Sequence, residues 1–219
     1  MASPAALPAE STATDAAVSE TVPADRVVSL STTACGHASG TSGAGVIIED
    51  GWVLASGHVV SAAGSVSVSS QFGESQAEVV VLDTQADLSL LSVPSVQASP
   101  IVLRSARSGD VIELAGGGPS AATSASITRP VDVRIEAVRS TERISRVGYE
   151  IDVTVQLGDS GGGAFNDDGA LVGIIYARSV VREDRSFLVG PEEIAETLEL
   201  DRTRSWTCDP SRHRIVPES

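Results

Sequence analysis

The chain has 219 residues, of which 42% are hydrophobic and 20% charged, and it contains no apolar run long enough to cross a membrane, so we expect no membrane contact from this chain itself. The formal net charge of −14 makes the average surface repel a phosphate backbone, which speaks against nucleic acid as a partner. Valine, serine, threonine and glycine dominate and the apolar segments are short, which favours an all-β fold.

Residues 1–25 are rich in Ala, Ser, Thr, Pro and Glu, and they have neither a positively charged start nor an apolar core. This composition is not that of a signal peptide, and it predicts a flexible leader or linker. Two origins stay open: an export or membrane anchor that lies upstream of this sequence, or an arbitrary starting point.

The first half of the chain carries six strand-like runs separated by glycine, and six short strands predict a small closed barrel over residues 26–96. The expected strands are residues 26–32, 43–50, 51–56, 65–70, 77–83 and 87–93. The Pro/Ser-containing segment 94–100 is a natural boundary between two halves.

The second half, residues 101–190, predicts another barrel, with strands expected at 110–116, 131–140, 149–156, 170–179 and 185–190. NDDG at 166–169 is a strong hairpin signal. Residues 191–200 begin with proline and two acids, and they are expected to form a C-terminal helix. The tail, 201–219, looks loop-like, with Cys208 as its main anchor.

Two cysteines, Cys35 and Cys208, lie near opposite ends of the expected globular region. They predict either one disulfide, which requires an oxidising compartment, or two unrelated buried thiols. The chain has no CxxC motif and no Cys/His cluster, so we expect no structural zinc, no other metal and no organic cofactor.

Three segments carry residues suited to nucleophilic catalysis. His58 follows a β-type run, Asp87 stands immediately before an apolar strand, and Ser160 lies in GDSGG. A serine nucleophile needs a base for its proton and hydrogen-bond donors for the developing oxyanion, and the backbone N–H groups of Gly158 and Ser160 are candidates for those donors. Taken singly, each residue has an ordinary structural explanation: a surface histidine, a turn aspartate and a hairpin turn.

Together the motifs ASGHVV, ADLSLL and GDSGGG, in the order His, Asp, Ser, resemble the trypsin-like serine peptidases of the chymotrypsin fold in their compact bacterial form. Within that family the chain looks similar to exported proteases of the high-temperature-requirement type and to the actinobacterial membrane-anchored acid-resistance proteases. The resemblance implies two six-stranded antiparallel barrels with the active site between them. It also implies that His58 is the base, Asp87 orients it, and Ser160 forms the acyl-enzyme.

Three details of the resemblance bear on substrates and regulation. Thr154 stands six residues before Ser160, where trypsin-type enzymes place the acid that binds Arg or Lys, so a small or medium apolar side chain is the default preference. Tyr176, Ala177 and Arg178 are expected to line the substrate cleft, where Arg178 either narrows the pocket or attracts an acidic group. For Asp159 we expect an internal arginine as partner rather than a new amino terminus at Val27.

The resulting hypothesis is an extracytoplasmic serine endopeptidase, secreted or periplasmic, that acts on peptides or proteins. Two alternatives stay open. One is a catalytically silent binding or sensor module with a protease fold, and the other is an esterase that uses the same three side chains.

Overall fold

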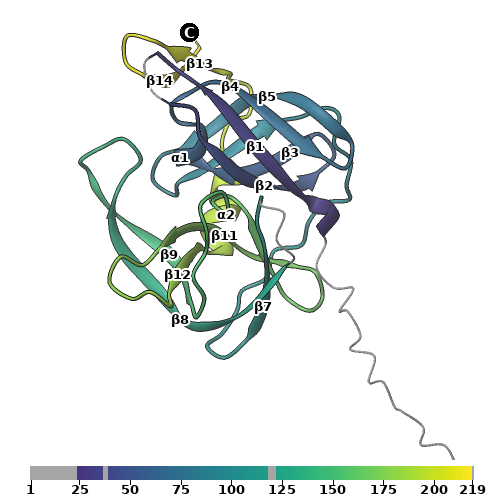
Figure 1. The fold of residues 1–219 in the computed structure, drawn as a ribbon, viewed down its shortest axis with the longest axis vertical. Helices are drawn as coiled ribbons and strands as arrows, with labels where there is room; N and C mark the ends of the chain where they lie inside the picture. The colour runs from purple at the N-terminus through teal and green to yellow at the C-terminus, as the bar shows by residue number, and fades with distance from the viewer. Residues whose placement is uncertain (1–23, 37–38, 118–121, 219) are drawn as a thin grey trace, which may run out of the picture.

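The structure is a computed structural model that describes residues 24–36, 39–117 and 122–218, and it has two β-structures packed side by side (Figure 1). Most of the expected leader therefore lies outside the described residues, and only its last part is seen, in a short 3-10 turn, Ala24–Arg26. Among the described residues, no helix is both long and apolar enough to cross a membrane.

The first β-structure is a ring of six antiparallel strands. Pairing runs from β4 through β1, β2 and β3 to β6, and β5 closes the ring because it pairs with both β6 and β4. Alternate side chains such as Leu30, Ile47 and Leu91 fill its interior. The strands are β1 (Val27–Ala34), β2 (Ser42–Glu49), β3 (Trp52–Ser56), β4 (Ala63–Ser70), β5 (Gly73–Asp83) and β6 (Leu88–Ser92).

The second β-structure is a closed barrel of six strands in the order β10-β11-β12-β9-β8-β7. The expected all-β architecture of two packed six-strand units is thereby confirmed. The strands are β7 (Val111–Ala115), β8 (Thr123–Glu136), β9 (Arg143–Ile151), β10 (Gly163–Phe165), β11 (Leu171–Arg178) and β12 (Ser186–Val189).

Strand positions in this second barrel differ from those that the sequence predicts. β8 begins at Thr123, eight residues before the expected start, in a Ser/Thr/Ala segment that also contains Pro130. β10 begins within the glycine run, where the sequence predicts a turn and no strand. The strand expected at 149–156 ends at Ile151, because the hydroxyl of Ser186 accepts from Val155 N and donates to Val153 O in place of ladder bonds.

The two barrels share one hydrophobic cluster and one helix. Leu54 and Leu88 of the first barrel pack in the same buried cluster as Phe165 and Ile174 of the second. Helix α2 (Pro191–Leu198), predicted from its proline and acids, spans the two: Thr197 Oγ1 donates to Asp83 Oδ2 at 3.1 Å, and Glu193 Oε1 accepts from the backbone N–H of β9. The seam between the barrels is thus fixed by packing and by hydrogen bonds.

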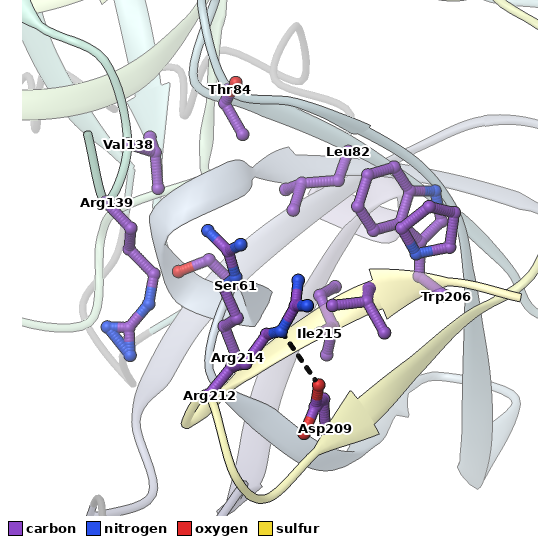
Figure 2. A pocket seen from close by; sticks show the side chains of 12 residues that line it. Ser61, Leu82, Thr84, Val138, Arg139, Trp206, Asp209, Arg212, Arg214 and Ile215 are labelled. Atoms are coloured by element: carbon purple, nitrogen blue, oxygen red, sulfur yellow. Dashed lines mark ion pairs between the residues drawn. The ribbon is translucent and has the colours of Figure 1, made fainter. Parts of the chain in front are cut away.

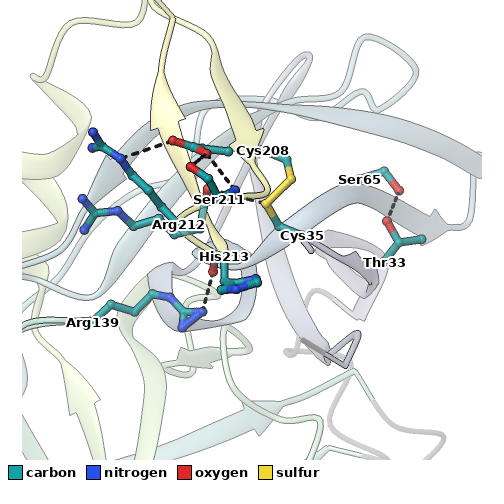
Figure 3. Close-up of a disulfide and its surroundings, with 10 residues drawn as sticks. Thr33, Cys35, Ser65, Arg139, Cys208, Ser211, Arg212 and His213 are labelled. Atoms are coloured by element: carbon teal, nitrogen blue, oxygen red, sulfur yellow. Dashed lines mark hydrogen bonds and ion pairs between the residues drawn. A yellow bond between two sulfur atoms is a disulfide. The ribbon is translucent and has the colours of Figure 1, made fainter. Parts of the chain in front are cut away.

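The tail forms a hairpin, so the expectation of a loop is wrong. Strands β13 (Trp206–Asp209) and β14 (Arg214–Pro217) pair with each other, and β13 adds to β5 of the first barrel (Figure 1). The predicted Cys35–Cys208 disulfide is present and ties this hairpin to the end of β1 (Figure 3). It closes a sequence separation of 173 residues, for which the chain-entropy model gives about 5 kcal/mol of stabilisation.

Candidate active site

His58 lies on α1 (Gly57–Val60), a single helical turn that follows directly from β3. Its backbone N–H donates to Asp87 Oδ1 at 2.7 Å, and its ring Nδ1 lies 2.8 Å from Asp87 Oδ2. Both carboxylate oxygens of Asp87 therefore contact His58, one at its backbone N–H and one at its ring. The contact at Nδ1 fixes the orientation of the imidazole. The side chain is still 39% exposed, so the ring remains accessible from solvent.

Asp87 is buried and has a backbone φ of +59°, a left-handed conformation that is uncommon for a residue with a side chain. Its carbonyl accepts a hydrogen bond from Gly57 N at 2.8 Å. A Cβ placed on Gly57 would lie only 3.3 Å from Asp87 Oδ1. The glycine before the histidine thus allows the two loops to approach closely.

Arg146, which the sequence analysis missed, lies directly behind this pair. It comes from β9 of the second barrel, is 2% exposed, and places Nη1 3.9 Å from Asp87 Oδ2. Its guanidinium also donates to the carbonyl of Gln85 at 2.6 Å and stacks over the Tyr176 ring at 4.8 Å. Arg146 thus places a buried cation of the second barrel beside the buried carboxylate of the first.

Ser160 follows a turn that glycine makes feasible. Asp159 N donates to Gln156 O at 3.2 Å, and Gly158, the third residue of this turn, has φ of +99°. These are the features of a type II turn, whose third position favours glycine. After the turn, Ala44 N donates to Ser160 O and Gly161 N donates to Ile175 O, both at 2.8 Å, so strands of both barrels hold the segment.

The serine and the histidine lie close together. A Cβ on Gly43 would lie 2.9 Å from Ser160 O and 2.8 Å from the side chain of Val59, the residue after His58. In the described part of the chain, however, no hydrogen bond joins the His58 ring to the Ser160 hydroxyl. Such bonds are often long in unliganded enzymes and tighten when substrate binds.

Asp159 has a different partner from the expected one. Its carboxylate accepts from Gln156 N at 2.7 Å and packs against Gly116, and no arginine forms an ion pair with it among the described residues. The expectation of an arginine partner is therefore wrong. Arg26 donates instead to Ile47 O and to Ser99, and Val27 is the first residue of β1, paired with Val46.

The sequence matches the model of one protein family, the trypsin-like peptidase domain, over residues 43–174, which is more than half of the chain. The chain belongs to this family. The motifs that carry the resemblance all lie within or beside the matched range.

Individual relatives agree with the family. Serine protease Rv3671c of Mycobacterium tuberculosis is 29% identical over 162 residues, covering 71% of this chain and 41% of that protein. A probable periplasmic serine endoprotease, DegP-like, of Halomonas elongata is 31% identical over 179 residues, covering 75% and 37%. This chain spans about two fifths of the length of these two relatives.

The fold comparison points the same way. The crystal structure of the active form of the Rv3671c protease superimposes with a TM-score of 0.74 at 27% identity, over 80% of this chain and 79% of that one. An HtrA-type protease, AlgW, crystallised with a tripeptide, has a TM-score of 0.65 at 23% identity, over 80% of this chain and 60% of that one. The second likeness concerns the fold alone.

The four residues that the sequence predicts for the substrate cleft divide into two groups. Tyr176 and Ala177 line a hollow of about 450 Å³ together with His58, Asp87 and Arg146. Thr154 and Arg178 lie outside the lining of this hollow, as far as the described residues define it. The Thr154 hydroxyl donates to Glu183 O, which ties the strand end to the loop before β12, and Arg178 is exposed at the end of β11.

Charge and burial are unusual around this hollow. Burial raises the pKa of Tyr176 to about 12, so its hydroxyl stays protonated at neutral pH. Burial also raises the pKa of Glu193, whose carboxylate accepts from Val147 N beside Arg146. The sequence signal that would have found Arg146 is weak, since an arginine in a strand pattern normally points to solvent.

No group of three or more His, Cys, Asp or Glu side chains within reach of one metal ion occurs in residues 24–36, 39–117 and 122–218.

Proposed function

We propose that the chain is a serine endopeptidase unit in which Ser160 attacks the peptide carbonyl, His58 takes and returns the proton, and Asp87 holds the imidazole. The single observation that carries this is the His58–Asp87 pair, with its 2.8 Å Nδ1–Oδ2 contact, beside the serine turn of a trypsin-like peptidase domain. Nδ1 bonded to a carboxylate leaves Nε2 as the nitrogen that receives the serine proton.

The oxyanion formed in this reaction needs donors at fixed positions, for which we propose the backbone N–H groups of Gly158 and Ser160. The turn supports this assignment, because among the described residues no hydrogen bond uses the N–H of Gly158 or of Ser160. We further propose residues 26–200 as the protease unit, with its first barrel at 26–96 and its second at 101–190. Thr154, Tyr176, Ala177 and Arg178 are the proposed contacts to substrate.

The proposed compartment is outside the cytoplasm. The Cys35–Cys208 disulfide needs an oxidising environment, and one of the relatives is named as periplasmic. The proposed substrates are peptides or proteins, with no requirement for a cofactor.

One observation favours a second candidate, a binding or sensor module that does not cleave: the described residues contain no hydrogen bond from the His58 ring to the Ser160 hydroxyl. Labelling with a fluorophosphonate probe distinguishes the two. For an enzyme, the wild type is labelled, Ser160→Ala is not, and Ser105→Ala, a serine on the second barrel outside the site, is labelled normally. Absence of labelling across pH 5–9, with and without added peptides, would support the silent module.

An esterase would be labelled as well, so the labelled protein is then offered a denatured protein and a chromogenic acyl ester. Cleavage of the denatured protein that depends on Ser160 supports the endopeptidase. Ester turnover without any protein cleavage would contradict it.

A further inference from the structure

A second hollow, of about 520 Å³, adjoins the hollow at His58, and the two share Ser61, Val138 and Arg139 in their linings. Its size lies within the range of small-ligand sites, about 300–1,000 Å³. Its other walls come from the end of β5 and from the β13–β14 hairpin (Figure 2).

Positive charge gathers in this hollow although the chain as a whole carries −14. Arg139 from the β8–β9 loop and Arg212 and Arg214 from the hairpin all line it, with a single acid, Asp209 (Figure 2). Asp209 pairs with Arg212 at 3.3 Å. Arg139 Nη2 donates to the carbonyl of His213, and within the described residues no acid pairs with Arg139. The guanidinium of Arg214 likewise forms no ion pair or hydrogen bond within that part of the chain.

The hollow also has an apolar wall. The indole of Trp206 and the side chains of Leu82 and Ile215 lie beside the arginines. An arginine group next to an aromatic and aliphatic surface suits a carboxylate whose neighbouring groups are apolar, because arginine binds carboxylates with two parallel hydrogen bonds.

Direct contacts connect this hollow to the proposed base. Ile215 N of β14 donates to Ser61 O at 3.0 Å, and the Ser61 hydroxyl donates to His58 O at 3.3 Å. On the other side, Val138 N donates to Thr84 O at 3.0 Å, which holds the loop of Arg139 against the first barrel. Arg139 itself has φ of +54°, a conformation that non-glycine residues adopt mostly where the surrounding structure imposes it. The disulfide holds the hairpin wall in place (Figure 3).

We propose that this hollow is an extended subsite that binds an acidic residue of the peptide substrate, held by Arg214 and Arg139 against Trp206. This inference rests on the proposed endopeptidase function, since continuity with the hollow at His58 is what assigns the ligand to the substrate. A peptide chain that passes His58 reaches the arginines through the shared lining residues. The protein would therefore cleave acidic peptides in preference to neutral ones, although its own surface is acidic.

The test separates binding from cleavage by using the full chain with Ser160→Ala, which leaves the hollow unchanged. The probes are eight-residue peptides, acetylated and amidated at their ends, in which one Glu moves through the positions, each matched with its Gln analogue. Binding is followed by calorimetry and by the fluorescence of Trp206 in a Trp52→Phe background, because the chain contains only two tryptophans.

We expect the Glu peptide to bind about three- to tenfold more tightly than its Gln analogue at one position, with the preference falling as salt rises. Arg214→Gln should reduce the ratio of the two affinities, Glu peptide over Gln peptide, toward one. Arg214→Lys should keep part of this preference for the Glu peptide. Arg107→Gln, an exposed arginine before β7, is the matched control and should leave it unchanged. Equal binding of Glu and Gln peptides at every position, or an unchanged ratio in Arg214→Gln, would overturn the proposal. Because these readouts need no turnover, they are independent of the labelling result.

Discussion

The two halves of the proposed active site are held by different kinds of contact. In the first barrel, side-chain contacts position the histidine. Both carboxylate oxygens of Asp87 accept hydrogen bonds from His58, and buried Arg146 of the other barrel lies beside Asp87. In the second barrel, the Ser160 turn is held through its backbone, by bonds to Ala44 and Ile175 and by the positive φ of Gly158. The base is thus assembled in advance, whereas the nucleophile depends on the shape of a loop.

Because of this difference, variants at His58 and at Ser160 should differ in stability although both should lose activity. Removing the imidazole takes one hydrogen-bond partner from the buried Asp87 carboxylate, which costs about 1–3 kcal/mol. Removing the serine hydroxyl breaks no hydrogen bond in the described structure, so it should change the free energy of unfolding by no more than about 0.5 kcal/mol.

The largest predicted effect is on turnover. His58→Ala, Ser160→Ala and the double variant should each lower kcat by about 10⁴-fold or more, and by similar amounts, because groups that act as a unit are not additive. Steady-state kinetics on a peptide measures this, and urea unfolding measures the unequal stabilities. Losses of kcat that multiply in the double variant would show that the two residues act separately.

Arg146→Met should have the second-largest effect, on both stability and turnover. Removing one partner from a buried charge pair costs about 3–5 kcal/mol of unfolding free energy. We expect kcat/KM to fall about 10- to 100-fold, because Asp87 loses the buried cation at 3.9 Å that helps to hold it against His58.

Arg107→Met, which replaces an exposed arginine, is the control for Arg146 and should change neither stability nor kcat/KM. An unchanged kcat/KM in a folded Arg146→Met variant would mean that Arg146 contributes to stability without positioning Asp87.

Gly158→Ala tests the Ser160 turn without changing the His58–Asp87 pair. The φ of +99° disfavours any side chain, by about 1–2 kcal/mol, although no atom lies within 4 Å of the new Cβ. The turn should shift, with kcat falling about tenfold while the His58–Asp87 contact persists. Gly51→Ala is a matched control, since Gly51 has φ of +77° and also faces open space, but lies in the β2–β3 turn. Equal losses of kcat in both variants would contradict a special role for the serine turn.

The smallest predicted effect is a shift in the ionisation of the tyrosines at alkaline pH. It leaves activity at neutral pH unchanged. The chain has only two, Tyr149 and Tyr176, and burial raises the pKa of both, that of Tyr176 to about 12. Absorbance at 295 nm should therefore show tyrosine ionisation displaced above pH 10, with the Tyr176 step near pH 12. Since the folded pKa lies above the unfolded value of 10, this contribution to stability is complete below pH 10 and is lost between about pH 10 and 12.

Tyr176→Phe should remove the later of the two ionisation steps and leave the Tyr149 step in place. A native titration with both tyrosines near pH 10 would mean that the seam around Arg146 is open to water.

How far the sequence predicted the structure depended on the kind of signal. Strands of the first barrel were close to their expected positions because apolar alternation and glycine turns coincide there, as in β2 and β3. In the second barrel the start of β8 was placed too late and β10 was missed, since a Ser/Thr/Ala run and a glycine run do not carry the alternation that marks a strand. The tail hairpin was missed for a related reason: its strands have four residues each, and β13 meets the barrel through one residue pair with β5, Trp206 and Val79.

The sequence by itself determined the family, the all-β architecture and the three candidate catalytic residues, because each of these is recorded in short local patterns whose order along the chain is itself informative. Only the tertiary structure decided that Arg146 supports Asp87, that Gln156 rather than an arginine holds Asp159, and that three arginines gather beside the hollow at His58. These contacts join residues from different strands and loops, and their strength comes from burial and proximity, which no local pattern in a sequence specifies.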